Sequence, residues 1–189
     1  MDRTEILKRL IAGNEKFITD KLSSHNQDSN RRETVTKGQD PFAIILSCAD
    51  SRVVPELIFD TGIGELFVVR VAGNVANTSS LASIEYAVAH LGTKVIVVLS
   101  HEDCGAVTAA VRGGDNGNNI KHLLSHITPA IQATVNKTNV NEIAQKNALL
   151  TAEDLIKKST IISDAVNSGK LHIVPAYYHL RTGGVDFLK

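Results

Sequence analysis

The chain has 189 residues, which is enough for one domain with a sizeable core and short for two. Its 20 lysines and arginines balance 20 aspartates and glutamates, so charge gives no bias toward nucleic acid or membrane, and the absence of tryptophan disfavours base stacking. No apolar run reaches membrane-spanning length, and the polar N-terminus leads into a helical pattern, so we expect a cytoplasmic protein.

The first half of the chain alternates helical patterns with short buried runs. In chain order, the spacing of apolar residues predicts a helix at 4–20, a polar loop or short helices at 21–40, strands at 42–46 and 66–71, a helix at 79–91 and a strand at 95–99. The first of these strands leads into Cys48, and the third leads into His101.

The second half is mainly helical. In chain order, its pattern predicts a helix at 104–112, a glycine-rich surface loop at 113–117, helices at about 119–135 and 140–167, a strand at 171–174 and a short final strand at 185–188. We find no internal repeat and no domain boundary. Buried β-branched runs that alternate with helices predict an α/β fold, with a central, mainly parallel β-sheet flanked by helices.

Three residues with metal-binding side chains follow the predicted strands: Cys48, His101 and Cys104. Two cysteines alone would indicate inert, buried thiols. In open α/β sheets, however, ligands gather at the carboxyl ends of strands. His101 and Cys104 are three residues apart where a helix is expected to start, and a helix N-terminus favours the thiolate that binds metal. The three side chains match a catalytic zinc site, which has three protein ligands and one open position.

A carboxylate and a guanidinium follow the first cysteine closely, at Asp50 and Arg52. A guanidinium can hold a carboxylate in a fixed bidentate orientation and keep it ionised. On a protein surface, such an ion pair contributes little to folding stability. Next to a zinc ligand, we expect Asp50 either to accept a hydrogen bond from a zinc-bound hydroxide or to compete for the open coordination position.

The two motifs together resemble the paired signature of the β-class carbonic anhydrases. They read Cys48-Ala49-Asp50-Ser51-Arg52 and His101-x-x-Cys104-Gly105, and the resemblance extends through the segments 64–70 and 83–88 and covers about 39–112. It implies one domain over 1–189, with an N-terminal helical arm at 1–40 and an α/β core at 41–189. A short antiparallel strand is expected at the C-terminus.

The resemblance also implies an activity, the reversible hydration of CO2 to bicarbonate and a proton. One zinc ion per chain would be bound by Cys48, His101 and Cys104. The dyad of Asp50 and Arg52 would orient the zinc-bound hydroxide, and in a closed resting state Asp50 would become the fourth zinc ligand.

Further positions resemble the family's substrate pocket. By this resemblance, an amide at Gln39 would hydrogen-bond a substrate oxygen, Phe67 and Tyr86 would be pocket aromatics, and Gly105 would line the site; ordinary core packing explains the two aromatics equally well. Some members have an allosteric bicarbonate pocket built on a tryptophan and an arginine. This chain has no tryptophan but keeps the arginine as Arg70, which is more simply a strand-end residue in an ion pair.

The expected partners are small molecules, CO2 and bicarbonate, and further copies of the chain, with no nucleic acid and no membrane. The resemblance implies a homodimer or homotetramer in which the N-terminal helix packs on a neighbouring subunit. Three other functions remain open at this point: a zinc hydrolase of carbonyl sulfide or carbon disulfide, a zinc-binding structural or sensing module without catalysis, and a thiol redox protein. The last is disfavoured because the cysteines do not form a CxxC motif.

Overall fold

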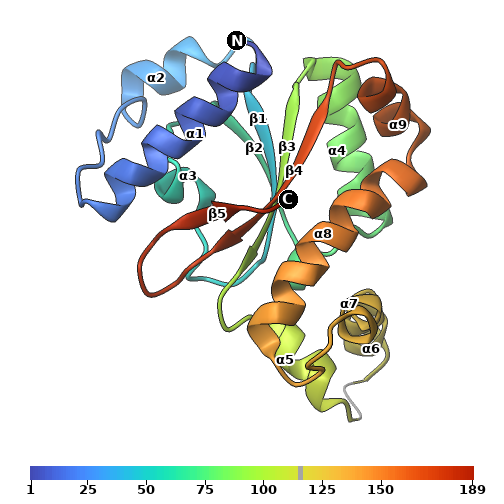
Figure 1. Ribbon diagram of the computed structural model, residues 1–189. Helices are drawn as coiled ribbons and strands as arrows, with labels where there is room; N and C mark the ends of the chain where they lie inside the picture. Colours follow the sequence, from blue (N-terminus) through green and yellow to red (C-terminus); the bar gives the residue numbers. More distant parts are fainter. Residues whose placement is uncertain (115–116) are drawn as a thin grey trace.

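A five-stranded sheet forms the centre of the computed structural model, which describes residues 1–114 and 117–189 (Figure 1). The strands lie in the order β2-β1-β3-β4-β5. Their bounds are Ala43–Ser47 (β1), Leu66–Arg70 (β2), Val95–His101 (β3), His172–Tyr178 (β4) and Val185–Phe187 (β5). The first four are parallel and β5 runs antiparallel to β4, so the predicted fold class is confirmed.

The two central strands are buried along their whole length, as parallel strands covered on both faces must be. Successive side chains point to opposite faces, so β1 and β3 contribute to two separate cores. Ile45 and Val97 belong to one core, and Ile44 and Ile96 to the other. The strand predicted at 95–99 is longer in the structure, where β3 continues through His101.

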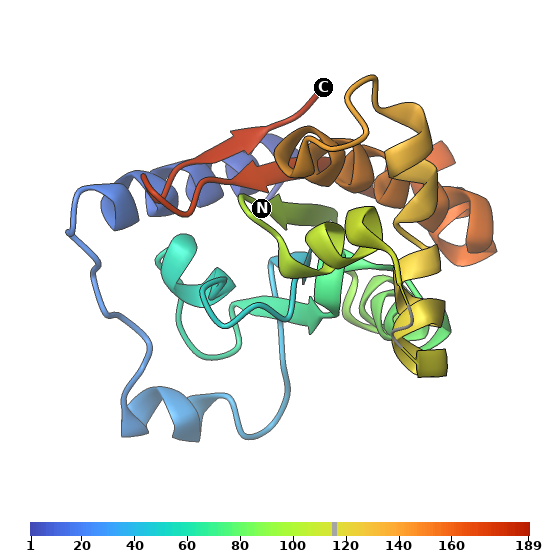
Figure 2. The ribbon, with the colours of Figure 1, turned by 90° about the horizontal axis from the view of Figure 1, so that it is seen from below.

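Helices cover both faces of the sheet and its carboxyl end. Their bounds are Arg3–Ile18 (α1), Ser29–Thr34 (α2), Pro55–Ile58 (α3), Thr78–Leu91 (α4), Gly105–Arg112 (α5), Gly117–Ser125 (α6), Thr128–Ala133 (α7), Val140–Lys158 (α8) and Thr160–Asn167 (α9). Figure 1 shows α1 and α3 on one side of the sheet and α4, α8 and α9 on the other, with α5, α6 and α7 beyond the end where β3 finishes. Figure 2 shows α2 in a segment of the chain that extends away from the sheet.

Two of the predicted helices are wrong in extent, because each is divided in two. The stretch 119–135 contains α6 and α7, since Pro129 has no N–H to donate to the carbonyl of Ser125 and so cannot continue α6. The stretch 140–167 is interrupted at Ser159, which has extended backbone angles and caps α9 by accepting a hydrogen bond from the N–H of Ile162. Residues 115 and 116 of the predicted loop at 113–117 lie outside the described residues.

Helix α1 packs on the sheet of its own chain. Ile6 and Leu10 are buried in the same core as β1 and β3. The amide of Asn14 donates to the carbonyls of Ile58 and Gly183, at 3.2 and 2.8 Å. Packing of the same helix on a neighbouring subunit, and the division into an arm and a core, stay predictions. No helix among the described residues has the length and apolar character needed to cross a membrane.

Candidate metal centre

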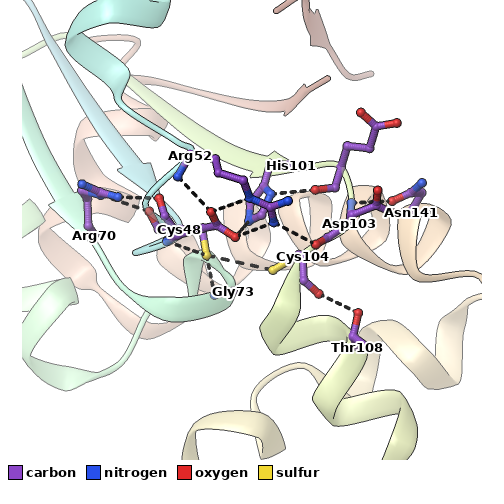
Figure 3. A network of polar contacts seen from close by, with 11 residues as sticks. Cys48, Arg52, Arg70, Gly73, His101, Asp103, Cys104, Thr108 and Asn141 are labelled. Atoms are coloured by element: carbon purple, nitrogen blue, oxygen red, sulfur yellow. Dashed lines mark hydrogen bonds and ion pairs between the residues drawn. The ribbon is translucent and has the colours of Figure 1, made fainter. Parts of the chain in front are cut away.

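The three predicted metal ligands meet at the carboxyl ends of the two central strands. Cys48 directly follows β1, His101 is the last residue of β3, and Cys104 occupies the N-cap position of α5. Their ligand atoms all lie within 4.8 Å of one another, and all three side chains are buried. Figure 3 shows the two sulfur atoms facing each other, and the Sγ–Sγ distance is 4.0 Å.

The thiol of Cys48 lies among hydrogen-bond donors. The backbone N–H of Gly73 donates to its sulfur at 3.2 Å, and the N–H of Asp50 does so at 3.4 Å. The neighbouring Cys104 thiol, together with His101 and these N–H groups, lowers the pKa of Cys48 well below its usual range. Because a thiolate is the form that binds metal, these contacts prepare Cys48 to be a ligand.

His101 presents one ring nitrogen to the two sulfurs. Its Nδ1 lies 2.8 Å from the carbonyl of Glu102, so Nδ1 carries the proton and donates it to that carbonyl. Nε2 is therefore a free acceptor. It is buried and has no hydrogen-bond partner among the described residues. An unpartnered imidazole nitrogen beside two thiols fits a zinc ion, which takes thiolate and imidazole ligands.

Asp50 and Arg52 form the bidentate pair that the spacing predicts. Nε and Nη2 of Arg52 donate to the two carboxylate oxygens at 2.9 and 2.8 Å, and the backbone N–H of Arg52 adds a third bond at 3.0 Å. The side-chain hydrogen bond from Arg52 is the largest cause that holds the pKa of Asp50 far below its usual range. The carboxylate lies beside the ligand atoms, since its Oδ2 is 3.9 Å from Nε2 of His101.

The turn between His101 and Cys104 is held by side chains from distant parts of the chain. Asp103 has a left-handed backbone, with φ of 50°. Its N–H donates to Oδ1 of Asn141 at the start of α8, at 2.9 Å, and its carbonyl accepts from Nη2 of Arg52 at 3.3 Å. Arg52 thus connects the carboxylate of Asp50 to the turn that carries two of the ligands (Figure 3).

Arg70 corrects one prediction. Among the residues that the structure describes, it has no carboxylate partner, so the expected strand-end ion pair is wrong. Its Nε donates instead to the carbonyl of Cys48 at 3.1 Å, and its Nη2 to the carbonyl of Asp50 at 2.7 Å. Arg70 thereby fixes the backbone on both sides of Ala49.

Gly73 is a site residue that the sequence analysis missed. Its φ of 69° is left-handed, and a Cβ there would lie 2.8 Å from the side chain of Ile127. The carbonyl of Gly73 accepts a 2.8 Å hydrogen bond from Asn147 of α8, which fixes the N–H that faces Cys48. The signal available in the sequence was a glycine shortly after the strand predicted at 66–71, since a glycine there often marks a close approach of backbone.

The predicted substrate residues lie in different places. Gly105 is the first residue of α5, next to Cys104. Phe67 is on β2 opposite Ile44, and it packs against the core beneath α4. Tyr86 lies on α4, is 49% exposed and contacts the ring of His90. Gln39 is exposed and lies before β1, whereas Cys48 follows that strand. The five residues of β1 therefore separate Gln39 from Cys48 within one chain. Their substrate roles stay predictions.

Comparisons with known proteins agree with this geometry. The family model described as carbonic anhydrase matches residues 43–185. Carbonic anhydrase 2 of Mycobacterium tuberculosis is 37% identical over 182 residues, which cover 93% of this chain and 88% of the relative. Among solved structures, the Coccomyxa β-carbonic anhydrase in complex with acetazolamide gives a TM-score of 0.77 at 25% identity, covering 99% of this chain and 86% of that one.

A second solved structure, the β-carbonic anhydrase CcaA, gives a TM-score of 0.74 at 26% identity and covers 97% of this chain and 98% of the other. The matched region includes all three buried ligands and every strand of the parallel sheet that positions them. The chain therefore belongs to the carbonic anhydrase family, in its β class.

Proposed function

We propose that this protein catalyses the reversible hydration of CO2 to bicarbonate and a proton, with one zinc ion held by Cys48, His101 and Cys104. The observation that carries the proposal is the buried group of two thiols and one unpartnered imidazole nitrogen. Membership of the carbonic anhydrase family supports CO2 as the substrate. Among the described residues the group holds three ligands, and a purely structural zinc site would have four.

Zinc bound there would act as a Lewis acid that lowers the pKa of a water from about 15.7 to about 7. The protein residues supply the surroundings. Glu102 fixes the tautomer of His101 through its carbonyl, so that Nε2 faces the metal. The N–H groups of Gly73 and Asp50 stabilise the thiolate of Cys48.

Asp50 would orient the attacking water through its carboxylate. Arg52 keeps that carboxylate ionised, and therefore able to accept a hydrogen bond but unable to donate one. Because both oxygens are held by the guanidinium, we propose that the carboxylate stays off the metal in this arrangement. A closed state, with Asp50 as a metal ligand, would require the bidentate pair to open.

The remaining substrate contacts are proposed from the family resemblance. Gln39 lies before β1, and Cys48 follows that strand. This position supports a contact between Gln39 and the metal centre of a neighbouring subunit more than a contact with the metal centre of the same chain. This fits the proposed self-association as a homodimer or homotetramer, and sedimentation of the zinc-loaded protein would test it. A cytoplasmic location also stays a prediction.

Stopped-flow CO2 hydration of the wild type and the Asp50→Ala variant tests the proposed function. We expect the variant to keep its zinc and to lose at least about a hundredfold in kcat, as removal of a group that positions a proton does. Asp40→Ala, which removes an exposed carboxylate just before β1, should leave the rate unchanged.

Two results would contradict the proposal. Full activity of Asp50→Ala would remove this residue from the reaction. A wild-type protein that carries one zinc per chain but does not hydrate CO2 would favour a non-catalytic zinc module, or, if it turns over carbonyl sulfide or carbon disulfide, a hydrolase of those molecules.

A further inference from the structure

A second site lies at the opposite end of the sheet from the metal centre. A pocket of about 560 Å³ is lined by the start of α1, the end of α4, the end of α9 and the residues that lead into β3 and β4. Figure 1 shows the N-terminus at this end of the sheet, while α5 lies beyond the other end. The volume is within the range of about 300–1,000 Å³ typical of small-molecule sites.

Positive charge gathers around this pocket. Arg3, Lys94 and Lys170 line it, together with His172, and the acidic residue in its lining is Asp2. The carboxylate of Asp2 is engaged in capping α1, where it accepts the N–H of residue 5 at 2.9 Å. The chain as a whole has a formal net charge of zero, so the cations are concentrated locally.

These cations lack acidic partners within the protein. In the described part of the chain, no carboxylate lies within 4.0 Å of the charged groups of Arg3, Lys94 or Lys170. Lys94 donates to a backbone carbonyl, that of Met1, at 3.2 Å. Like charges that face one pocket repel one another, and an anion between them would relieve this repulsion.

The contact between Arg3 and His172 leaves the charge of Arg3 available to an anion. Nη1 of Arg3 lies 3.2 Å from Nε2 of His172. A guanidinium only donates hydrogen bonds, so the imidazole accepts and is neutral in this pair. Burial and the charge of Arg3 both lower the pKa of His172. The remaining N–H groups of Arg3 are left to bind an oxyanion in the planar, two-point geometry that guanidinium favours.

The other side of the pocket is apolar. Val88 and Ala165 line it, from α4 and α9, and Leu171 beside them is 1% exposed. We propose that this pocket binds a small organic oxyanion, a carboxylate or a phosphate monoester on a compact apolar body, with the oxyanion at Arg3, Lys94 and Lys170. The site is separate from the metal centre, since His101 lies at the far end of β3 from Lys94.

Calorimetric titration of the zinc-loaded protein with phenyl phosphate tests this site. We expect one probe per chain, and weaker binding of inorganic phosphate, which lacks the apolar body, and of benzyl alcohol, which lacks the charge. The Lys94→Gln/Lys170→Gln variant should lose at least about tenfold in affinity, and Arg3→Gln should lose a similar factor, because each removes charge-assisted hydrogen bonds. Benzoate as a second probe shows whether carboxylate or phosphate binds more tightly.

The matched control is Lys21→Gln/Lys37→Gln, which removes two exposed lysines elsewhere and changes the net charge equally. It should bind phenyl phosphate as the wild type does. A probe that binds the metal would keep its affinity in all variants, and that result would overturn the proposal. Equal losses in the control variant, or no binding by the wild type at millimolar phenyl phosphate, would overturn it too.

Discussion

At the scale of single residues, Asp50 is held at three points. Its carboxylate lies on Arg52, its carbonyl accepts from Arg70, and its N–H donates to the sulfur of Cys48. Each contact fixes a different atom, so the position of the carboxylate relative to the metal ligands depends on all three. Arg70 does this from β2 without touching the ligand atoms, and we assign it a positioning role.

Replacing Arg70 tests that role. In Arg70→Ala, the carbonyls of Cys48 and Asp50 lose hydrogen bonds from a charged donor, which contribute about 1.5–3 kcal/mol each. We expect kcat for CO2 hydration to fall by about tenfold or more with zinc content unchanged. Arg32→Ala, on the exposed surface of α2, is the control. A variant as active as the wild type would show that the backbone contacts of Arg70 do not matter for the reaction.

The ligands and the dyad could be predicted from sequence because short motifs carry them. Arg70, Gly73 and Asn141 were misassigned or missed, since each contacts a residue 20 or more positions away through a backbone group, its own for Gly73 and the partner's for the other two. No local pattern records such a contact. A glycine after a strand, or an asparagine at a helix start, has an ordinary explanation in turns and caps.

At the scale of elements, the contact between α1 and the end of α3 depends on Gly13, which has no side chain. A Cβ on Gly13 would fall on the carbonyl group of Phe59, which is backbone and cannot rotate away. Nearby, Asn14 bonds to the same region through the carbonyl of Ile58. The close approach of the two elements therefore requires glycine at position 13.

Gly13→Ala tests whether α1 packs on its own chain in this way. Alanine favours a helix by about 1 kcal/mol over glycine, yet we expect the variant to unfold at lower urea, with a net loss of about 1–3 kcal/mol from overpacking. Gly38→Ala, where a Cβ meets nothing within 4 Å, is the control. Stabilisation of Gly13→Ala would indicate that α1 leaves this position, as it would if it packed only on a neighbouring subunit.

The strands could be located from sequence because buried parallel strands are continuous apolar runs. The helices were less well defined. Their apolar spacing continues across the breaks at Ser159 and near Pro129, and the chain changes direction there because of a cap and a missing N–H. The short α3 was not predicted, since it buries only Pro55 and Ile58 and gives no periodic pattern.

At the scale of the whole molecule, buried carboxylates make stability depend on pH. Burial alone would raise the pKa of Glu65, but the N–H of Gly62 and the guanidinium of Arg9 outweigh it and lower the pKa. A carboxylate with a lowered folded-state pKa contributes stability above its unfolded pKa of about 4.3, and this contribution is lost as the pH falls through the folded value.

Urea unfolding of the wild type and Glu65→Gln at a series of pH values tests this dependence. We expect the wild type to be more stable at pH about 6, and the difference between the two proteins to shrink as the pH falls below about 4. Comparing two zinc-loaded proteins removes the effect of metal loss that both share. A difference that stays constant or grows toward low pH would contradict the role of the ionised Glu65.

Zinc dependence is the most direct test of the central claim, that Cys48, His101 and Cys104 hold the one metal ion needed for CO2 hydration. The protein is stripped of metal with a chelator, zinc is added back in steps, and the hydration rate is measured at each step. We predict no activity without metal, and a rate that rises linearly and reaches its plateau at one zinc per chain. Full activity of the metal-free protein, or an inactive protein with one zinc bound, would contradict the account.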